Sequence, residues 1–306
     1  MLEIAVMIEG QNGLTWPRWQ RIARLVEDAG FVGLFRSDHF TNSNHPDIES
    51  LDLWPSLTWL ASHTERIEFG PLVTPFSFRH PVHTARMSAA VDDLSGGRLV
   101  LGLGAGWNAR EHHLFGFELL KPNARFNRLE EGLEVVTRLL QSDEPVTFEG
   151  EYYQLRGARL LPRPQRPGGP RILIGGNGIK RTLTYVVRYA TEWNCVSLRP
   201  DDFARLNQRL TGMLTASGRA PDSARRSMMT GCVFGKDDVT LHQKIAARGS
   251  TLEKLHEHGT IAGSLDTVRE QLAALEQAGL QRIMLQWLDL DDLESLEALA
   301  KGLLRP

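Results

Sequence analysis

Three short stretches of the sequence combine reactive or very small residues with positions just after predicted buried strands. The first is Ser37-Asp38-His39, which follows the apolar residues Leu34 and Phe35. A histidine at a strand end can transfer a proton near neutral pH, and a carboxylate can tune or orient the site around it. Adjacent residues of a strand face opposite ways, so Asp38 and His39 need not touch. We predict catalytic roles for both; the alternative for a lone histidine is a structural role.

The second stretch is a glycine-rich loop between an apolar run and a predicted helix. It contains Gly175, Gly176, Asn177 and Gly178. Small residues let the backbone approach a ligand closely, and the amides at a helix N-terminus favour anions. The loop is therefore predicted to bind a phosphate, with help from the cations Lys180 and Arg181 of the next turn. The alternative is an ordinary tight turn.

The third stretch is GLGAGWN, with glycines at 102, 104 and 106. Its G-x-G-x-G spacing differs from the G-x-G-x-x-G of dinucleotide-binding folds, so it is a weak signal for a nicotinamide cofactor. The glycines leave the strand end nearly free of side chains, which suits a planar ring lying on the backbone. Close packing at the rim of a barrel is the alternative.

Composition and spacing argue against several other functions. The formal net charge is −2, and no basic stripe with interleaved aromatic residues predicts a nucleic-acid partner. No H-E-x-x-H or C-x-x-C pattern predicts a metal site, and His112 and His113, neighbours on a predicted helix, should face apart. Cys195 and Cys232 are expected to be reduced core residues. The N-terminus lacks the basic start and apolar run of a signal peptide, no membrane span is predicted, and a cytoplasmic location is expected.

The elements that must position these stretches alternate along nearly the whole chain. About eight apolar runs, each followed by an amphipathic run, predict an α/β fold, a (β/α)8 TIM barrel; a doubly wound open sheet is the second choice. Strict alternation about Glu149-Gly150 predicts a β-hairpin insertion. A polar segment, 236–262, reads as an insertion after strand seven, helical and partly mobile. One domain over 1–306 is expected. The predicted strands are 4–8, 31–35, 67–74, 98–106, 171–175, 193–198, 227–235 and 282–287.

Several motifs taken together resemble the bacterial luciferase-like family of flavin and deazaflavin oxidoreductases. The resemblance covers essentially the whole chain, and the subgroup resembled depends on coenzyme F-420, a deazaflavin. The motifs that carry it are MIEGQ, RSDHF, LVTPFSFRHP, LSGGRLVLGLGAGWN, FEGEYYQL and ILIGGNG.

This resemblance implies a cofactor ring at the carboxyl face of the barrel, with its phosphate on the fifth-strand loop. It also implies a cis peptide at Leu72–Val73, and it matches Asp38 and His39 to the family's Asp-His pair. The cofactor-binding residues that it implies are Leu72, Val73, Thr74, Gly104, Ala105, Gly106, Gly175, Gly176, Asn177 and Gly178.

The chain departs from the family's sugar-phosphate dehydrogenases at Trp107, where those enzymes have an acid. An apolar or conjugated small-molecule substrate is therefore expected in place of a sugar phosphate. Five aromatic residues are predicted to line a hydrophobic mouth, although several of them could be core: Trp16, Trp54, Phe76, Phe78 and Trp107.

The predicted activity is hydride transfer between coenzyme F-420 and an organic substrate. The alternatives are an FMN-dependent monooxygenase, with a possible flavin reductase partner, and a flavin-binding protein without catalysis. A homodimer is also possible, because Trp54, Leu57 and Leu60 fall on one face of a predicted helix; the chain's own sheet could equally cover that face.

Overall fold

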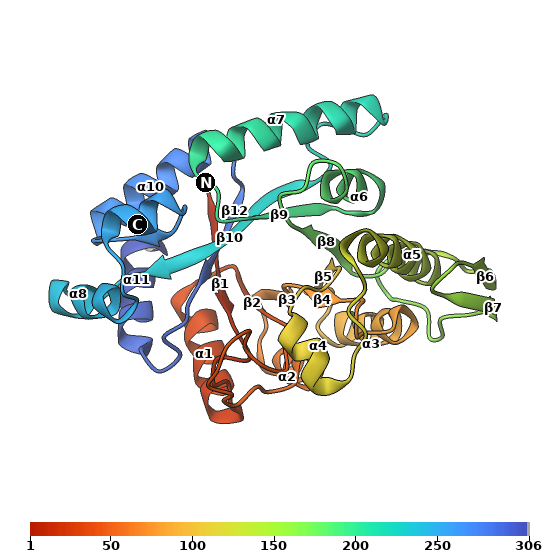
Figure 1. Cartoon of the computed structure of the whole chain (residues 1–306), viewed down its shortest axis with the longest axis horizontal. Coiled ribbons are helices and arrows are strands. Elements are labelled where there is room, and N and C mark those ends of the chain that lie inside the picture. The colour runs from red at the N-terminus through yellow and green to blue at the C-terminus, as the bar shows by residue number, and fades with distance from the viewer. Residues whose placement is uncertain (305–306) are drawn as a thin grey trace.

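A barrel of parallel strands forms the centre of the molecule in the computed structural model, which describes residues 1–304 (Figure 1). The sheet order is β3-β2-β1-β12-β10-β9-β8-β5-β4. β3 and β4 share one position in the barrel, because they are two halves of one strand that is interrupted at residues 72 and 73. A bridge between Phe69 and Leu99 closes the ring beside β5. The predicted eight-stranded barrel is confirmed. Its strands are β1 (Glu3–Ile8), β2 (Gly33–Arg36), β3 (Glu68–Pro71), β4 (Thr74–Pro75), β5 (Val100–Gly104), β8 (Arg171–Gly175), β9 (Glu192–Val196), β10 (Arg225–Val233) and β12 (Arg282–Gln286).

Helices cover the outside of the barrel, one or more after each strand position. The first helix, for example, buries one face that consists of Trp19, Ile22, Ala23 and Val26. It ends at Gly30, whose φ of +95° suits a glycine. A short helix, α4, follows β5 and carries His112 and His113, the neighbours that were predicted to lie on a helix. The bounds are α1 (Trp16–Ala29), α2 (Leu53–His63), α3 (Pro81–Leu94), α4 (Ala109–Phe115), α5 (Pro122–Gln141), α6 (Thr182–Tyr189), α7 (Pro200–Ala216), α10 (Leu265–Gln277) and α11 (Leu293–Leu304).

Two apolar layers hold the barrel together. The interior is filled by a small cluster that includes Met7, Phe35 and Met284, all essentially inaccessible to solvent. A much larger cluster joins the outer face of the strands to the helices. Because both faces of the strands are buried, their sequences read as continuous apolar runs, which is why the alternation of elements was easy to predict.

Both predicted insertions are present. The hairpin, β6 (Val146–Glu149) and β7 (Gln154–Ala158), extends away from the barrel beyond α5 (Figure 1). The segment after β10 contains α8 (Asp238–Ala247), α9 (Leu252–Glu257) and the short strand β11 (Ile261–Ala262). It is helical, as expected, and Lys244 ties it to Asp289 and Asp292 in the loop after β12.

None of the helices within residues 1–304 is both long enough and apolar enough to cross a membrane. Over the same residues, no three histidine, cysteine or acidic side chains converge as a metal site would require. The two cysteines are unpaired and buried. Burial raises the pKa of the Cys232 thiol to about 12 and that of Cys195 further, so neither is a reactive thiolate.

Candidate active site

His39 and Glu111 form the central pair of the candidate site, at the carboxyl ends of β2 and β5. The Nδ1 atom of His39 lies 3.0 Å from Oε2 of Glu111 and 3.2 Å from its Oε1. The backbone amide of Phe40 also donates to Glu111, at 2.5 Å. Glu111 is fully buried, whereas the His39 side chain is 15% exposed. Since a carboxylate only accepts hydrogen bonds, Nδ1 is the protonated nitrogen, and Nε2 is left for a reactant.

The surroundings of His39 are acidic. Burial by itself lowers the pKa of the imidazole, but the hydrogen bond and charge of Glu111 outweigh it, with smaller contributions from Glu9 and Asp38. The net effect raises the pKa of His39 above its ordinary value. The site therefore favours the protonated imidazole more than free solution does, and this is the form that can donate a proton.

Asp38, the other predicted catalytic residue, faces a different set of partners. Its carboxylate accepts from the hydroxyl of Thr74 at 2.9 Å and from Arg79 at 2.7 and 3.1 Å. The contact with His39 is made by Glu111, so Asp38 does not orient the histidine directly. Asp38 instead fixes Thr74, one of the residues predicted to hold the cofactor, and it adds negative charge near His39.

The break between β3 and β4 lies at Leu72–Val73, and this peptide bond is cis, as the family resemblance implies. The side chain of Val73 fills the space above the neighbouring glycines. A Cβ atom at Gly104 would lie 2.5 Å from Val73 Cγ2, and one at Gly175 would lie 3.4 Å from its Cγ1. Close packing at the barrel rim therefore requires a glycine at position 104. This is the alternative explanation that the sequence left open for the GLGAG motif.

Gly106, which ends that motif, is required for a different reason. Its φ is +79°, a conformation that other residues rarely adopt, and a Cβ there would collide with Ser77. Between Gly104 and Gly106 lies Ala105, half-buried at the same rim. The segment from 104 to 106 thus turns sharply into Trp107 and places it beside His39.

The loop of Gly175, Gly176, Asn177 and Gly178 leads from β8 towards α6. The side-chain amide of Asn177 bonds both the amide and the carbonyl of Val196 at the end of β9, which pins the loop. Gly176 has a φ of +123°. Cβ atoms at Gly176 and Gly178 would lie 3.3 and 3.1 Å from the hydroxyl of Thr182, so side chains would fill the space in front of α6.

The donors at this helix end suit a phosphate. No side chain caps the N-terminus of α6, although the amide of Leu183 in its first turn donates to the carbonyl of Gly178 at 3.0 Å. The remaining amides of the turn are without a side-chain cap and can serve an anion. Of the two cations expected to assist, Lys180 is exposed beside the loop. Arg181 instead bonds Asn127 and the hydroxyl of Tyr185, which turns its guanidinium towards α5. The residues present fit a phosphate bound by backbone amides, without a contact from Arg181.

A hydrogen-bonded network that sequence reasoning missed joins the ends of β1, β2 and β12. Glu9 accepts from Gln286 at 2.6 Å and from Gln11 at 2.8 Å. The Ser37 hydroxyl donates to Gln11 at 2.6 Å and accepts from the amide of Gly10 at 2.8 Å. The motif MIEGQ thus supplies a third acid, besides Asp38 and Glu111, whose charge reaches His39.

Glu111 itself was also missed, because a helix of seven residues shows too little of the helical period to indicate which side chain faces the site. A weaker signal was available. Asn108 caps α4 by accepting from the amide of Glu111, and Gly116 ends the helix with a φ of +73°. The pattern N-x-x-E followed by glycine is a helix signature. His112 is buried and His113 exposed, so these neighbours face apart as predicted.

The expected aromatic mouth needs correction. Phe76 and Trp54 are 1% and 5% exposed and belong to the core that joins the helices to the sheet. Trp16 lies on α1, in a separate groove between helices. Of the five residues, Phe78 and Trp107 lie near His39: the Trp107 ring is 5.7 Å from that of His39, and Phe78 contacts Phe40 at 5.2 Å.

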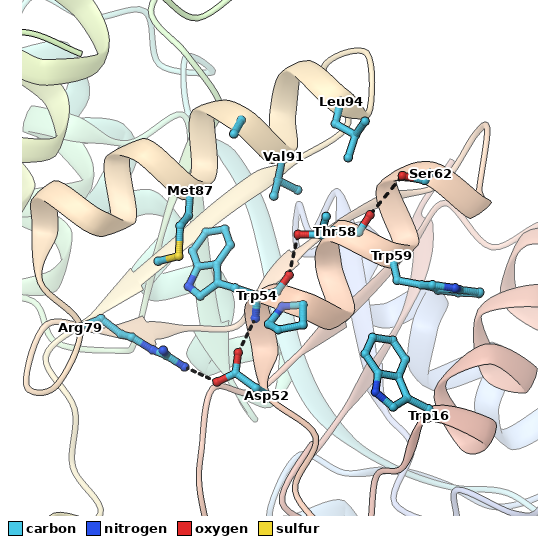
Figure 2. A pocket seen from close by; sticks show the side chains of 12 residues that line it. Trp16, Asp52, Trp54, Thr58, Trp59, Ser62, Arg79, Met87, Val91 and Leu94 are labelled. Atoms are coloured by element: carbon cyan, nitrogen blue, oxygen red, sulfur yellow. Dashed lines mark hydrogen bonds and ion pairs between the residues drawn. The ribbon is translucent and has the colours of Figure 1, made fainter. Parts of the chain in front are cut away.

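The groove that contains Trp16 runs between α1, α2 and α3 and has a volume of about 800 Å³ (Figure 2). Trp59, Met87 and Leu94 give it an apolar lining. At one end, Asp52 accepts from the amide of Trp54 and pairs with Arg79, the same arginine that holds Asp38 (Figure 2).

Two of the three residues that suggested a dimer line no exposed face. Leu57 and Leu60 are fully buried in the chain's own core, which is the alternative that the pattern left open. Trp54 is nearly buried in the same core but also lines the groove, together with Thr58 and Trp59 of α2.

The chain matches known proteins over most of its length. A sequence model described as luciferase-like monooxygenase matches residues 3–247. An F420-dependent glucose-6-phosphate dehydrogenase from Kineococcus radiotolerans is 32% identical over 69% of this chain, a match that covers 62% of that relative's length. A 4-hydroxyprotoasukamycin monooxygenase from Streptomyces nodosus subsp. asukaensis is 26% identical over 93% of this chain and 84% of the relative.

A solved structure has the same fold. The F420-dependent secondary alcohol dehydrogenase in complex with an F420-acetone adduct superposes with a TM-score of 0.85, covers 98% of this chain and 97% of its own, and is 18% identical.

Proposed function

The chain belongs to the luciferase-like monooxygenase family, and we propose that it is an oxidoreductase that transfers hydride between coenzyme F-420 and a small organic substrate. The observation that carries this proposal is the His39–Glu111 pair, a buried carboxylate holding a partly exposed imidazole at the carboxyl face of the barrel. Reduction of a carbonyl by hydride requires one proton, and the raised pKa of this histidine favours the form that supplies it. Relatives named as F420-dependent enzymes support the choice of cofactor.

The chain's own residues have separate tasks in this proposal. The amides that follow Gly176 in this loop bind the cofactor's phosphate, whereas the amide of Gly176 itself donates to the carbonyl of Asn194. Leu72, Val73, Thr74 and the segment from Gly104 to Gly106 form the surface that supports its ring. His39 donates a proton through Nε2 during reduction and accepts one in the reverse direction, while Glu111 keeps the imidazole in place. The bound deazaflavin would supply the hydride chemistry.

An FMN-dependent monooxygenase is the second candidate. It is favoured by the likeness to a monooxygenase over 93% of this chain. The phosphate loop fits the phosphate of either cofactor. In that case a flavin reductase would be needed to supply reduced FMN.

Oxygen dependence separates the two candidates. The purified chain is incubated with reduced coenzyme F-420 and a panel of ketones, with and without oxygen, and the oxidised cofactor is followed by its absorbance. Hydride transfer continues at an equal rate without oxygen and yields alcohols. Turnover that appears only with reduced FMN and oxygen would contradict the proposal and support the monooxygenase.

A further inference from the structure

Three apolar side chains stand exposed on the segment that follows β5, next to the candidate site. Trp107 is 61% exposed, Leu114 52% and Phe115 48%. The ring of Trp107 meets that of His39 at 79°, with centroids 5.7 Å apart, and the ring of Phe115 lies 5.0 Å from that of Phe40. Exposed apolar side chains that gather beside a reactive group are typical of a ligand-binding surface.

These exposed rings rest on a packed aromatic support. Phe40 contacts Phe78 at 5.2 Å and Phe117 at 5.5 Å, and Phe78 contacts Phe117 at 5.3 Å. Arg79 lies over the rings of Phe40 and Phe78 at 5.7 Å from each centroid. Because the supporting rings are held by one another, the exposed surface is ordered before any ligand arrives, which lowers the entropic cost of binding.

Two of the arginines that border this surface, Arg79 and Arg110, are already paired with acids. Arg79 binds Asp38 and Asp52. Arg110, on α4, binds both oxygens of Asp47, at 2.7 and 2.6 Å. A phosphate or carboxylate on a substrate would have to break one of these ion pairs to bind a guanidinium: the bridging pair of Arg79 or the bidentate pair of Arg110.

The charges around the reactive histidine are also largely paired with one another. Glu111 is paired with His39 itself and Asp38 with Arg79, and Glu9 adds a further negative charge nearby. Within residues 1–304, no acidic side chain pairs with Arg125, which donates to the carbonyl of Gly106 at 3.0 Å. This balance favours an uncharged substrate, and Arg125 makes the anionic alternative testable.

From these contacts we infer that Trp107, beside His39, forms a binding surface for an uncharged ketone conjugated to a planar aromatic ring. This inference rests on the proposed function and specifies its substrate class. In the reduction, hydride from the reduced deazaflavin bonds to the carbonyl carbon and the C=O π bond breaks. The oxygen takes a proton from His39, so that the ketone becomes an alcohol and the cofactor is oxidised by two electrons. Trp107 determines specificity by contact with the substrate ring.

Two ketones of similar size test the inference directly. Acetophenone carries a planar ring, and cyclohexyl methyl ketone carries a puckered one. Their dissociation constants are measured by ligand-detected NMR, on the chain with and without oxidised coenzyme F-420. Aromatic pairs contribute about 0.5–1.5 kcal/mol beyond area burial, so acetophenone should bind about 2- to 10-fold more tightly. D-Glucose 6-phosphate serves as the anionic probe.

Four variants assign the preference to its source. Trp107→Ala should remove the preference for acetophenone, and Trp107→Phe should keep most of it. Val239→Ala, which truncates an exposed apolar side chain on α8, is the matched control and should change nothing. Arg125→Gln tests recruitment of an anion. Thermal unfolding of each variant verifies that the fold is kept, and Trp107→Phe decides the question if Trp107→Ala does not fold.

The outcomes separate this inference from the proposed function. A preference for acetophenone that is lost in Trp107→Ala alone supports it, even if coenzyme F-420 fails to bind and the proposed function is wrong. An unchanged preference in Trp107→Ala overturns it. So does glucose 6-phosphate binding that exceeds acetophenone binding and is lost in Arg125→Gln. A changed molecular mass of Trp107→Ala, with ketone binding unaffected, would assign the surface to a protein contact instead.

Discussion

Replacing Glu111 with glutamine keeps the size of a fully buried side chain but removes its charge. Glu111 accepts from the Nδ1 of His39 and from the amide of Phe40. A hydrogen bond to a charged group contributes about 1.5–3 kcal/mol and a neutral one about 0.5–1.5 kcal/mol, so each bond weakens by about 1 kcal/mol. Glu111→Gln should therefore lower the free energy of unfolding by about 2 kcal/mol when His39 is protonated.

This loss of unfolding free energy should depend on pH, and the raised pKa of His39 makes it larger at low pH than at high pH. Burial opposes the charged imidazole, but Glu111 raises its pKa above the ordinary 6.5. A group whose pKa is higher in the folded state than in the unfolded state stabilises the fold fully at pH values below its unfolded-state pKa. That contribution is lost as the pH rises through its folded-state pKa. The difference between the native chain and Glu111→Gln should shrink from about 2 kcal/mol to about 1 kcal/mol, the share of the Phe40 amide.

The assay is urea unfolding of both proteins at pH values on either side of the His39 titration, together with NMR titration of the ring. Glu118→Gln, which neutralises an exposed acid just beyond α4, is the control for a general change of charge. A stability difference that is equal at both pH values, or an unchanged His39 pKa in Glu111→Gln, would refute the ion pair and its role in poising the histidine.

Three further predictions test other parts of the site. His39→Ala should reduce turnover at saturating cofactor by about 10²–10⁴-fold with a smaller change in cofactor affinity, whereas weakened affinity with an unchanged rate would leave the histidine only a binding role. Gly176→Val should abolish cofactor binding in a folded protein, measured by fluorescence titration; Gly218→Val, also at positive φ but facing open space, should bind normally. Trp59→Asp should convert a homodimer to a monomer by light scattering if the groove is the interface, and a native monomer would rule the dimer out.

The fold could be predicted from sequence because each element carries its own signal. The strand at 171–175 was predicted with the observed bounds, since a fully buried strand is a short apolar run ended by glycines. The third strand was predicted as continuous over 67–74, but the cis bond between Leu72 and Val73 divides it. Nothing in the apolar run itself reports that break; the family resemblance does.

The site could be predicted only where its residues follow strands. His39 and Asp38 could be singled out because they follow an apolar run directly, and their catalytic roles stay predictions. Glu111 was missed because it reaches His39 across 72 positions of sequence, from a helix of seven residues. The sequence also does not report whether a given tryptophan is buried. Trp54 and Trp107 are the same residue type, but Trp54 lies in the core and Trp107 is exposed to solvent.

Cofactor choice is the most direct test of the account. The purified chain is titrated separately with coenzyme F-420 and with FMN, and binding is followed by the fluorescence of each cofactor, with Gly176→Val as the negative control. The account predicts saturable binding of coenzyme F-420 that is tighter than binding of FMN and is lost in the variant. Tighter binding of FMN, or binding of coenzyme F-420 that persists unchanged in a folded Gly176→Val, would contradict it.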